Sequence, residues 1–138
     1  MKIVRKFTKE GEDPFAQVEF AKRTSRITNP DGSLVFEASD LVIPKDWSQV
    51  AVDIIAQKYF RKAGVPRETR TMMEKGIPEW LRRSVPDDEV LANLPAEQQF
   101  GMEKDARLVF RRIAGGWTYW GYKHQYFDSE TDALAFFD

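Results

Sequence analysis

The 138-residue chain contains no cysteine. It therefore cannot form a disulfide framework, offer a thiolate nucleophile or bind zinc through cysteine. Histidine is almost as scarce, because His124 is the only imidazole in the sequence. Most of the side-chain chemistry that makes a small protein an enzyme is thus missing. The lack of cysteine suits a cytoplasmic protein, and we expect that location.

Neither sign of charge is in excess, since 21 Lys and Arg stand against 22 Asp and Glu. A domain that holds nucleic acid usually has a strong basic excess, so a nucleic-acid partner is not favoured. Long apolar runs are also absent, because no segment approaches the ~18–20 apolar residues that a membrane span needs. The basic start of the chain, Met1–Glu10, lacks the apolar segment of a secretory signal. Length and ordinary composition indicate a single domain, residues 1–138.

The segment 17–43 has the pattern of a β-hairpin. Its break is Asn29–Gly32, where Pro and Gly supply the backbone angles of a tight turn. Both flanks, 18–28 and 34–43, are rich in β-branched and aromatic residues. Two strands alone are marginally stable, so a helix is expected to cover their apolar face. Residues 1–16 are charged and irregular, which leaves both an ordered arm and a frayed tail open.

Residues 46–63 have the strongest helical pattern. Asp46 can cap the helix, with Gln49 three residues later as in a capping box. We expect Ile54 and Ile55 to be buried against the hairpin. The apolar stripe at helical spacing is Trp47, Val50, Ala51, Ile54, Ile55 and Tyr59.

Residues 64–101 hold four of the seven prolines, so long regular elements are not expected there. Pro78–Arg83 can form a helical turn anchored by Trp80 and Leu81, and Asp87–Leu94 can form another. The fold class predicted from these patterns is α+β. It is a small antiparallel β-hairpin sheet packed against several α-helices, with a proline-rich irregular middle.

A second helix is predicted to begin at Met102 and a last one at Glu130, capped by Asp128 and Ser129. Two adjacent glycines, Gly115 and Gly116, weaken the second helix, which can end or kink there. Its apolar face comprises Met102, Ala106, Val109, Phe110, Ile113 and Trp117.

The most distinctive segment is Ala114–Phe127, which has two Trp, three Tyr and one Phe in 14 residues. Rings at this density usually pack against the chain's own core or against a partner. On a helix, residues 117 and 119 lie about 200° apart, so these rings cannot all face one side. We expect Trp117 to be core and Tyr119 or Tyr122 to point outward. The candidate interface residues are Trp117, Tyr119, Trp120, Tyr122 and Tyr126.

Other candidate sites have simpler interpretations. His124 lies four residues before Asp128, but no nucleophile accompanies them, so a surface histidine is favoured. The glycines of this region match no phosphate-loop spacing. The adjacent carboxylates of Asp87–Glu89 do not converge and are expected to be solvated. Aromatic rings near Lys123 could stack on the bases of a single strand, although an amphipathic helix with a solvated basic side is favoured.

Five segments, in this order and at this spacing, resemble the N-terminal domain of bacterial adenosylcobalamin-dependent (class II) ribonucleotide reductases. Together they cover nearly the whole chain, and the Trp-Ser-Gln helix and the Trp-Thr-Tyr-Trp-Gly run are the most specific. The segments are Arg23–Ser33, Pro44–Pro66, Ile77–Asp87, Ala106–Arg112 and Trp117–Gly121.

The resemblance implies a part of an enzyme rather than a catalyst. These enzymes reduce ribonucleotides with a radical generated from adenosylcobalamin, which passes to a cysteine in an α/β barrel. Because this chain has no cysteine, no catalytic, cofactor-binding or metal residue can be assigned to it. We expect the barrel to begin beyond Asp138, and the isolated chain to be inactive.

The resemblance further implies an accessory domain that packs on the catalytic barrel, walls the nucleotide cleft or helps to hold a dimer. Its partner would then be the barrel domain or subunit of the reductase, or a second copy of the chain. Two alternatives remain open: an independent module for nucleotide or single-stranded nucleic acid, and a separate subunit that regulates a reductase.

Overall fold

The computed structural model describes all residues, 1–138, and they form two compact units. The hairpin unit comprises Phe15–Val65 and Gly101–Val109. The helical unit comprises Met1–Pro14, Pro66–Phe100 and Phe110–Asp138. Helices and small antiparallel sheets occur together, which confirms the predicted α+β class. No helix has both the length and the apolar character needed to span a bilayer.

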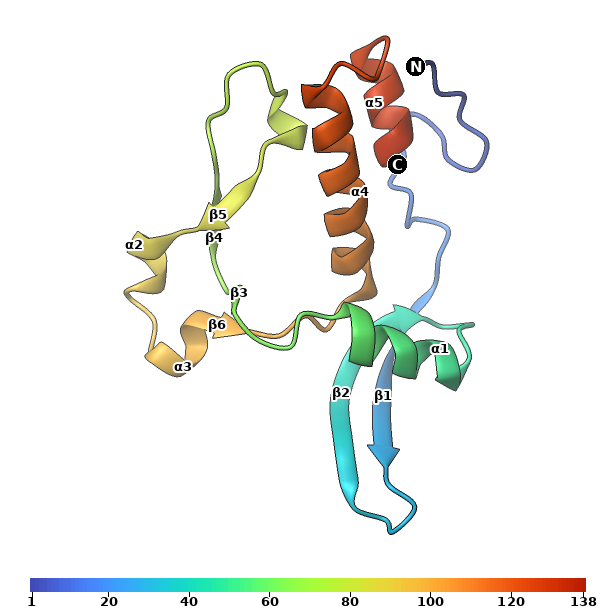
Figure 1. Cartoon of the computed structure of the whole chain (residues 1–138), viewed down its shortest axis with the longest axis vertical. Coiled ribbons are helices and arrows are strands. Elements are labelled where there is room, and N and C mark those ends of the chain that lie inside the picture. The colour runs from blue at the N-terminus through green and yellow to red at the C-terminus, as the bar shows by residue number, and fades with distance from the viewer. The chain divides into compact units, whose positions relative to one another are not determined.

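The hairpin unit is built on strands β1 (Phe20–Thr28) and β2 (Leu34–Pro44), which pair antiparallel as predicted (Figure 1). At the turn, the Gly32 N–H donates to the Asn29 carbonyl at 2.9 Å, and Gly32 has a φ of 84°. Such a positive φ suits glycine, which has no Cβ to clash. Asp31 accepts from both the hydroxyl and the N–H of Ser33, which lowers the pKa of its carboxyl.

A β-bulge interrupts the hairpin near its middle. The pairs Arg23–Leu41 and Ser25–Ala38 leave Thr24 opposite two residues of β2. One of these is Asp40, whose φ of 57° supplies the left-handed backbone that bulges often use. The bulge leaves the Thr24 carbonyl outside the ladder, where a helix can reach it.

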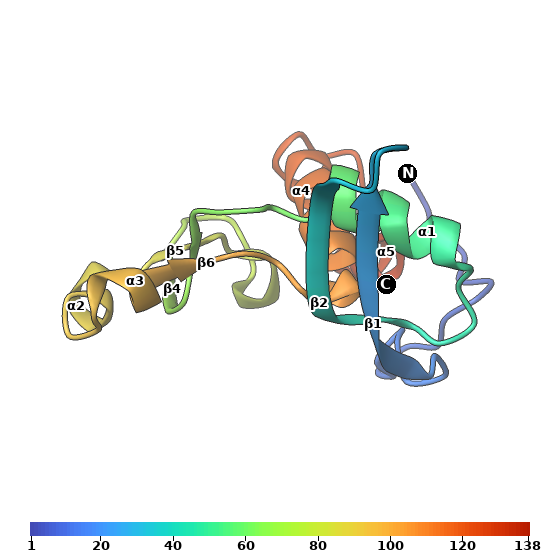
Figure 2. The same ribbon diagram turned by 90° about the horizontal axis from the view of Figure 1, so that it is seen from below.

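That helix is α1 (Gln49–Ile54), followed directly by the π-helical turn η1 (Ile55–Tyr59). Figure 1 shows α1 lying at the end of the hairpin away from its turn, and Figure 2 shows it beside the strands from below. The predicted cap at Asp46 is wrong. Ser48 caps the helix instead, because its hydroxyl accepts from the Ala51 N–H at 3.3 Å. The segment therefore starts later and ends earlier than residues 46–63.

The buried side of α1 is set by polar contacts with the hairpin. Gln49 Nε2 donates to the Thr24 carbonyl at 2.9 Å, and the hydroxyl of Ser25 donates to Asp53 Oδ1 at 2.7 Å. Ser25 is fully buried, so its hydroxyl needs such an acceptor. These contacts turn Gln49 and Asp53 toward the strands. The residues buried from this segment are Val52, Ile55, Ala56 and Phe60.

The predicted apolar stripe is therefore correct at one isoleucine and wrong at the other. Ile55 is 4% exposed, whereas Ile54 is 50% exposed. The sequence offers two apolar stripes on this helix, and periodicity alone does not distinguish them. The hydroxyl of Ser25 bonds to Asp53, and this contact turns the side of the helix that carries Ile55 toward the hairpin.

Residues 103–105 complete the hairpin unit at the edge of β2. The Val42 N–H donates to the Lys104 carbonyl at 2.7 Å, and Asp105 bridges to Val42 in parallel. Glu103 is buried, and its carboxylate accepts from the N–H and the Nε of Arg61 at 2.9 and 2.8 Å. Because this stretch is extended, the predicted helix start at Met102 is wrong.

The middle of the chain is irregular, as its prolines predict. The expected turn around Trp80 and Leu81 forms as η2 (Glu79–Leu81), and Asp87 caps α2 (Asp88–Leu91) by accepting from the Val90 N–H at 3.3 Å. Strands β4 and β5 pair antiparallel. The short elements are β3 (Val65–Pro66), β4 (Thr69–Thr71), η2 (Glu79–Leu81), β5 (Ser84–Pro86), α2 (Asp88–Leu91), α3 (Ala96–Gln99) and β6 (Phe100–Gly101).

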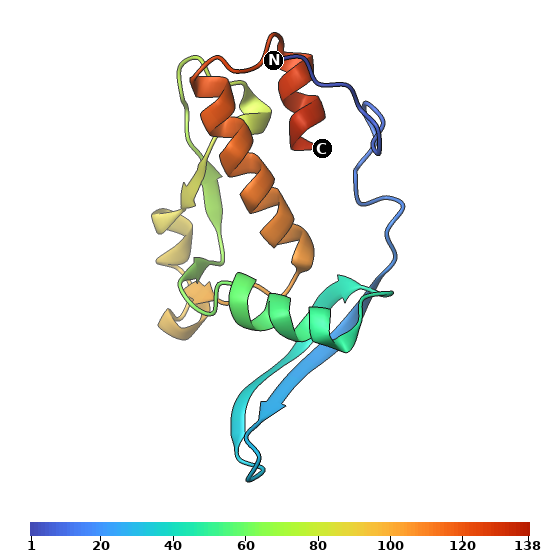
Figure 3. The same cartoon turned by 45° about the vertical axis from the view of Figure 1, so that its right-hand side comes forward.

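The main helices are α4 (Ala106–Lys123) and α5 (Glu130–Phe137). The first turn of α4 belongs to the hairpin unit and its remainder to the helical unit. The helix passes through Gly115 and Gly116 without ending, so the predicted end at these glycines is wrong. Within the helical unit, α5 runs beside α4 (Figure 3), and Ser129 caps α5 as predicted.

The N-terminal residues form an ordered arm on α5. The Ile3 N–H donates to Asp132 Oδ1 at 2.8 Å, and Arg5 pairs with Asp138 at 2.7 Å. The Ser129 hydroxyl and the Ile3 N–H both lower the pKa of the Asp132 carboxyl. Of the two states that the sequence left open, the structure shows the ordered one.

The two isoleucines of this segment give a matched test of the observed packing. Ile55→Ala should lower the free energy of unfolding by about 2–4 kcal/mol, because it leaves a cavity among buried residues. Ile54→Ala, on the exposed side, should change it by only about 0.5 kcal/mol. Urea unfolding measures both changes, provided that the dependence of the free energy of unfolding on urea concentration is the same in the variants and the parent. Equal losses for the two variants would contradict the assigned face.

Candidate interaction site on helix α4

The aromatic residues of α4 divide into exposed and buried sets. Trp117 is 66% exposed, Trp120 is 59% exposed and Tyr126, just past the helix, is 63% exposed. Tyr119 is 8% exposed and packs in a buried cluster, with Tyr122 partly buried against it. The prediction that the rings divide is therefore confirmed. Their assignment is reversed, because Trp117 was expected in the core and Tyr119 or Tyr122 outside.

The reversal follows from a change of buried face along α4. Ala106 and Val109 are buried in the first turn, whereas Thr118 and Tyr119 are buried further on. Val109 and Thr118 lie about 180° apart around a helix, since nine residues are two and a half turns. The first turn and the remainder belong to different units. The prediction that Trp117 is buried assumed that the face of Ala106 and Val109 stays buried along the whole helix, and this assumption is wrong.

Tyr119 is held by the segment 74–83. Its ring packs with Ile77 and Leu81, and its hydroxyl donates to Glu74 Oε2 at 2.7 Å. Trp80 packs against the same cluster, and its indole N–H donates to Glu130 Oε1 at 2.8 Å. The sequence placed Trp80 and Leu81 as anchors without identifying the helix that they meet.

Glu74 is the centre of a charged cluster beside Tyr119. The guanidinium of Arg83 donates to both carboxylate oxygens, with Nε at 3.1 Å from each and Nη2 at 2.9 Å from Oε2. Arg83 and then the Tyr119 hydroxyl lower the pKa of Glu74 from 4.5 to about 2. The bond to the Glu74 carboxylate in turn raises the pKa of Tyr119. These bonds fasten the segment 74–83 to the second half of α4.

A cavity of about 530 Å³ lies next to this cluster, within the helical unit. Residues 74–77 form one side of it, and Tyr119, Tyr122, Lys123 and Gln125 form the other. Gly76 and Gln125 both have positive φ angles, of 80° and 57°, so each side turns sharply at the cavity. No signal in the sequence pointed to this cavity, because its sides are more than forty residues apart in the chain.

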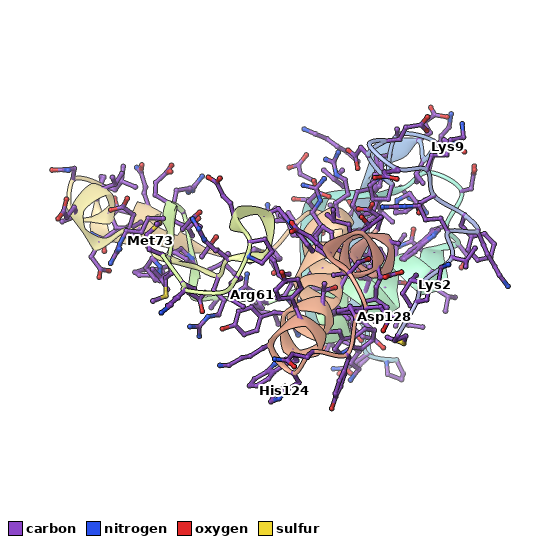
Figure 4. The ribbon with its side chains drawn as sticks, turned by 90° about the horizontal axis from the view of Figure 1, so that it is seen from above. Lys2, Lys9, Arg61, Met73, His124 and Asp128 are labelled. Atoms are coloured by element: carbon purple, nitrogen blue, oxygen red, sulfur yellow. The ribbon has the colours of Figure 1, made fainter.

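The outer side of α4 carries a row of stacked rings. Trp120 and His124 are parallel within 9°, with ring centres 5.8 Å apart, and the centre of Tyr126 lies 6.2 Å from that of His124. Figure 4 shows His124 projecting from the end of the helix. It is exposed, as the sequence favoured, and Asp128 pairs with the N-terminal ammonium. We call Trp117, Trp120, His124 and Tyr126 the aromatic surface.

A family model described as class II vitamin B12-dependent ribonucleotide reductase matches residues 21–138. The chain belongs to the N-terminal domain family of these reductases. The resemblance that the sequence motifs indicated is thereby confirmed.

Similar proteins include the vitamin B12-dependent ribonucleotide reductase of Agrobacterium fabrum, which is 51% identical over 138 residues. The enzyme of that name from Bradyrhizobium diazoefficiens is 49% identical over the same number of residues. Both matches cover 100% of this chain and 11% of the relative. A third, from Streptomyces coelicolor, is 31% identical over 117 residues, 82% of this chain and 12% of the relative. The chain thus spans about 11% of the length of the Agrobacterium and Bradyrhizobium relatives.

The residues of this reductase domain do not fit a cobalt or other metal centre. No three His, Asp or Glu side chains converge on a common point. His124 stacks between Trp120 and Tyr126, and Asp87 caps α2. The glycines considered for a phosphate loop, Gly115, Gly116 and Gly121, lie inside α4.

Gly121 tests the packing that supports the aromatic surface. A Cβ at this position would lie 2.7 Å from a ring carbon of Phe127. The centre of the Phe127 ring is in turn 5.4 Å from the centre of the Phe136 ring. Gly121→Ala should therefore lower the free energy of unfolding by about 1–3 kcal/mol. Gly116→Ala meets no atom within 4 Å and should raise it by about 0.5–1 kcal/mol. Thermal and urea unfolding check the opposite signs, and a stabilised Gly121 variant would contradict the contact.

Glu74 gives the domain a specific acid sensitivity. Because its pKa falls from 4.5 to about 2 on folding, its ionised form stabilises the fold above pH 4.5. That stabilisation is lost as the pH falls toward 2. The Glu74→Gln variant should therefore have a lower free energy of unfolding than the parent at pH 6. The difference between the two should become smaller as the pH falls from 4.5 toward 2. Glu79→Gln, an exposed carboxylate in the same segment, is the control, and a constant gap for Glu74→Gln would refute the assignment.

Proposed function

We propose that this chain is the accessory N-terminal domain of an adenosylcobalamin-dependent ribonucleotide reductase, and that the aromatic surface of α4 docks onto the catalytic part. The parent enzyme would reduce ribonucleotides to deoxyribonucleotides in the cytoplasm. This chain would form one domain of it, with the catalytic barrel lying outside residues 1–138. It would contribute surface and position rather than a reacting group.

The observation that carries the proposal is the exposure of Trp117 and Trp120, one turn apart on α4. Large apolar rings in water are costly, and Trp and Tyr are the residues on which interface affinity most often depends. Tyr126 adds a third exposed ring. Tyr119 and Tyr122 support this surface from the packed side of the helix. Of the five candidate interface residues, Trp117, Trp120 and Tyr126 are exposed, whereas Tyr119 and Tyr122 lie on the packed side of the helix.

The rigidity of the support strengthens the proposal. The exposed rings sit on a helix that is fixed from behind by Glu74, Arg83 and the Ile77–Leu81 cluster. A preorganised surface loses little conformational entropy when it binds. This arrangement suits a permanent contact inside a large enzyme.

An independent nucleic-acid module is the second candidate. The ammonium of Lys123 lies 5.7 Å from the centre of the Trp120 ring, and a cation beside stacked rings is the pattern that single strands bind. The near-neutral charge of the chain speaks against it. Strong, salt-dependent binding of an oligonucleotide would favour this candidate over docking.

The docking proposal is tested in a whole reductase. The matched segment of the Agrobacterium fabrum relative is replaced by this chain, and Trp117→Ala and Trp120→Ala are introduced together. We expect protease to cut between this domain and the remainder about tenfold faster or more, as losing central aromatic anchors implies. Phe7→Ala, which removes an exposed ring elsewhere, is the control. Equal cutting rates in the parent and double variants would refute the proposal.

A further inference from the structure

The cavity beside α4 has two cations at its rim that no carboxylate neutralises. Lys75 and Lys123 line it, and neither forms an ion pair. Arg83, the nearest guanidinium, is already bound to Glu74 through several hydrogen bonds. Glu74 also lines the cavity, but its charge is balanced by Arg83, so the two lysines leave the lining positive although the chain as a whole carries a net charge of -1.

The apolar and aromatic part of the cavity lining comes from three residues, which are Ile77, Tyr119 and Tyr122. Ile77 is buried, and the rings of Tyr119 and Tyr122 stand across from it. The volume of about 530 Å³ falls within the range of sites that bind small molecules or anchor side chains. Such a site favours an occupant with an apolar body and acidic groups beside it.

Lys123 joins this cavity to the aromatic surface. Its ammonium lies 5.7 Å from the centre of the Tyr119 ring and 5.7 Å from that of Trp120. Tyr119 faces the cavity, whereas Trp120 belongs to the exposed row of rings. A partner that covers Trp120 therefore also reaches the rim of the cavity.

We propose that the cavity receives an aromatic or large aliphatic side chain from a peptide segment whose neighbouring residues are Asp or Glu. The side chain packs on Ile77 and Tyr122, and the carboxylates pair with Lys75 and Lys123. This inference rests on the proposed docking function in one respect, because the segment is taken to belong to the same partner.

The position of the cavity disfavours a phosphate group. Phosphate sites are commonly built on the N-terminal ends of helices, where free N–H groups and the helix dipole attract an anion. This cavity lies at the C-terminal end of α4, where the dipole has the opposite sign. The guanidinium fork that could hold a phosphate is occupied by Glu74. The helix dipole acts on a carboxylate as well, so the distinction rests on the guanidinium fork, which single carboxylates paired with Lys75 and Lys123 do not need.

The test uses the full 138-residue chain and synthetic peptides. The probe is the blocked peptide Asp-Glu-Phe-Glu-Asp, and backbone amide shifts at Gly76, Ile77 and Tyr122 report on occupancy. Two control peptides replace Phe by Ala or all four acids by Lys, and pyrophosphate tests the phosphate alternative. We expect the probe to shift these amides, and each control peptide and pyrophosphate to bind at least tenfold more weakly. Equal binding of pyrophosphate or of the Ala peptide would overturn the inference.

Matched charge variants make the test specific. Lys75→Glu with Lys123→Glu should weaken probe binding at least tenfold, and Lys75→Gln with Lys123→Gln should weaken it to a smaller extent. Lys2→Glu with Lys6→Glu, which changes the net charge equally at residues that do not line the cavity, should alter binding less than twofold. An equal loss of peptide binding in the Lys75/Lys123 and the Lys2/Lys6 double Glu variants would show a general effect of net charge and would overturn the proposed site. In a further outcome, the peptide fails to bind while the tryptophan double variant still speeds proteolysis of the whole reductase. That result would refute the acidic partner of the cavity and leave the docking proposal intact.

Discussion

One carboxylate holds the candidate site together. Glu74 accepts from Arg83 on its own segment and from the hydroxyl of Tyr119 on α4. These bonds join two stretches of chain that are 45 residues apart in sequence. The segment 74–83 has only short elements of its own, and these bonds add to the packing of Ile77 and Leu81 on Tyr119. The buried place of Tyr119, the cavity beside it and the outward direction of Trp117 all follow from this attachment.

A second carboxylate, that of Glu103, joins distant segments within the hairpin unit. Glu103 is buried and satisfied by the backbone and side chain of Arg61. A buried charge without its partners is strongly destabilising, so these bonds require Arg61 and Glu103 to meet in the folded state. They bring residues 103–105 to the edge of β2, which blunts a strand edge that would otherwise be free to pair with another chain.

Local chemistry made the hairpin turn, the irregular middle and the last helix predictable. Asn29–Gly32, the prolines and Ser129 each act through their own backbone geometry or nearest neighbours. The misplaced parts depend on distant partners. The side on which α1 is buried depends on the hydroxyl of Ser25, and the start of α4 depends on Lys104 bonding to Val42. Composition alone predicts that the rings of the aromatic run divide between two sides, whereas the direction of each ring depends on the segment 74–83, which is far away in sequence.

The π-helical turn Ile55–Tyr59 gives the hairpin unit an uneven tolerance to changes in chain length. Its closing bond runs from the Phe60 N–H to the Ile55 carbonyl at 3.0 Å, one residue further than in an α-helix. The extra residue rotates the chain by about 100° before Phe60, which is buried. Removing one residue from this turn would restore regular α-helical spacing and swing the Phe60 ring out of the core. The five residues of η1 therefore act as a fixed spacer, whereas the exposed turn at Asn29–Gly32 can lengthen without moving any buried side chain.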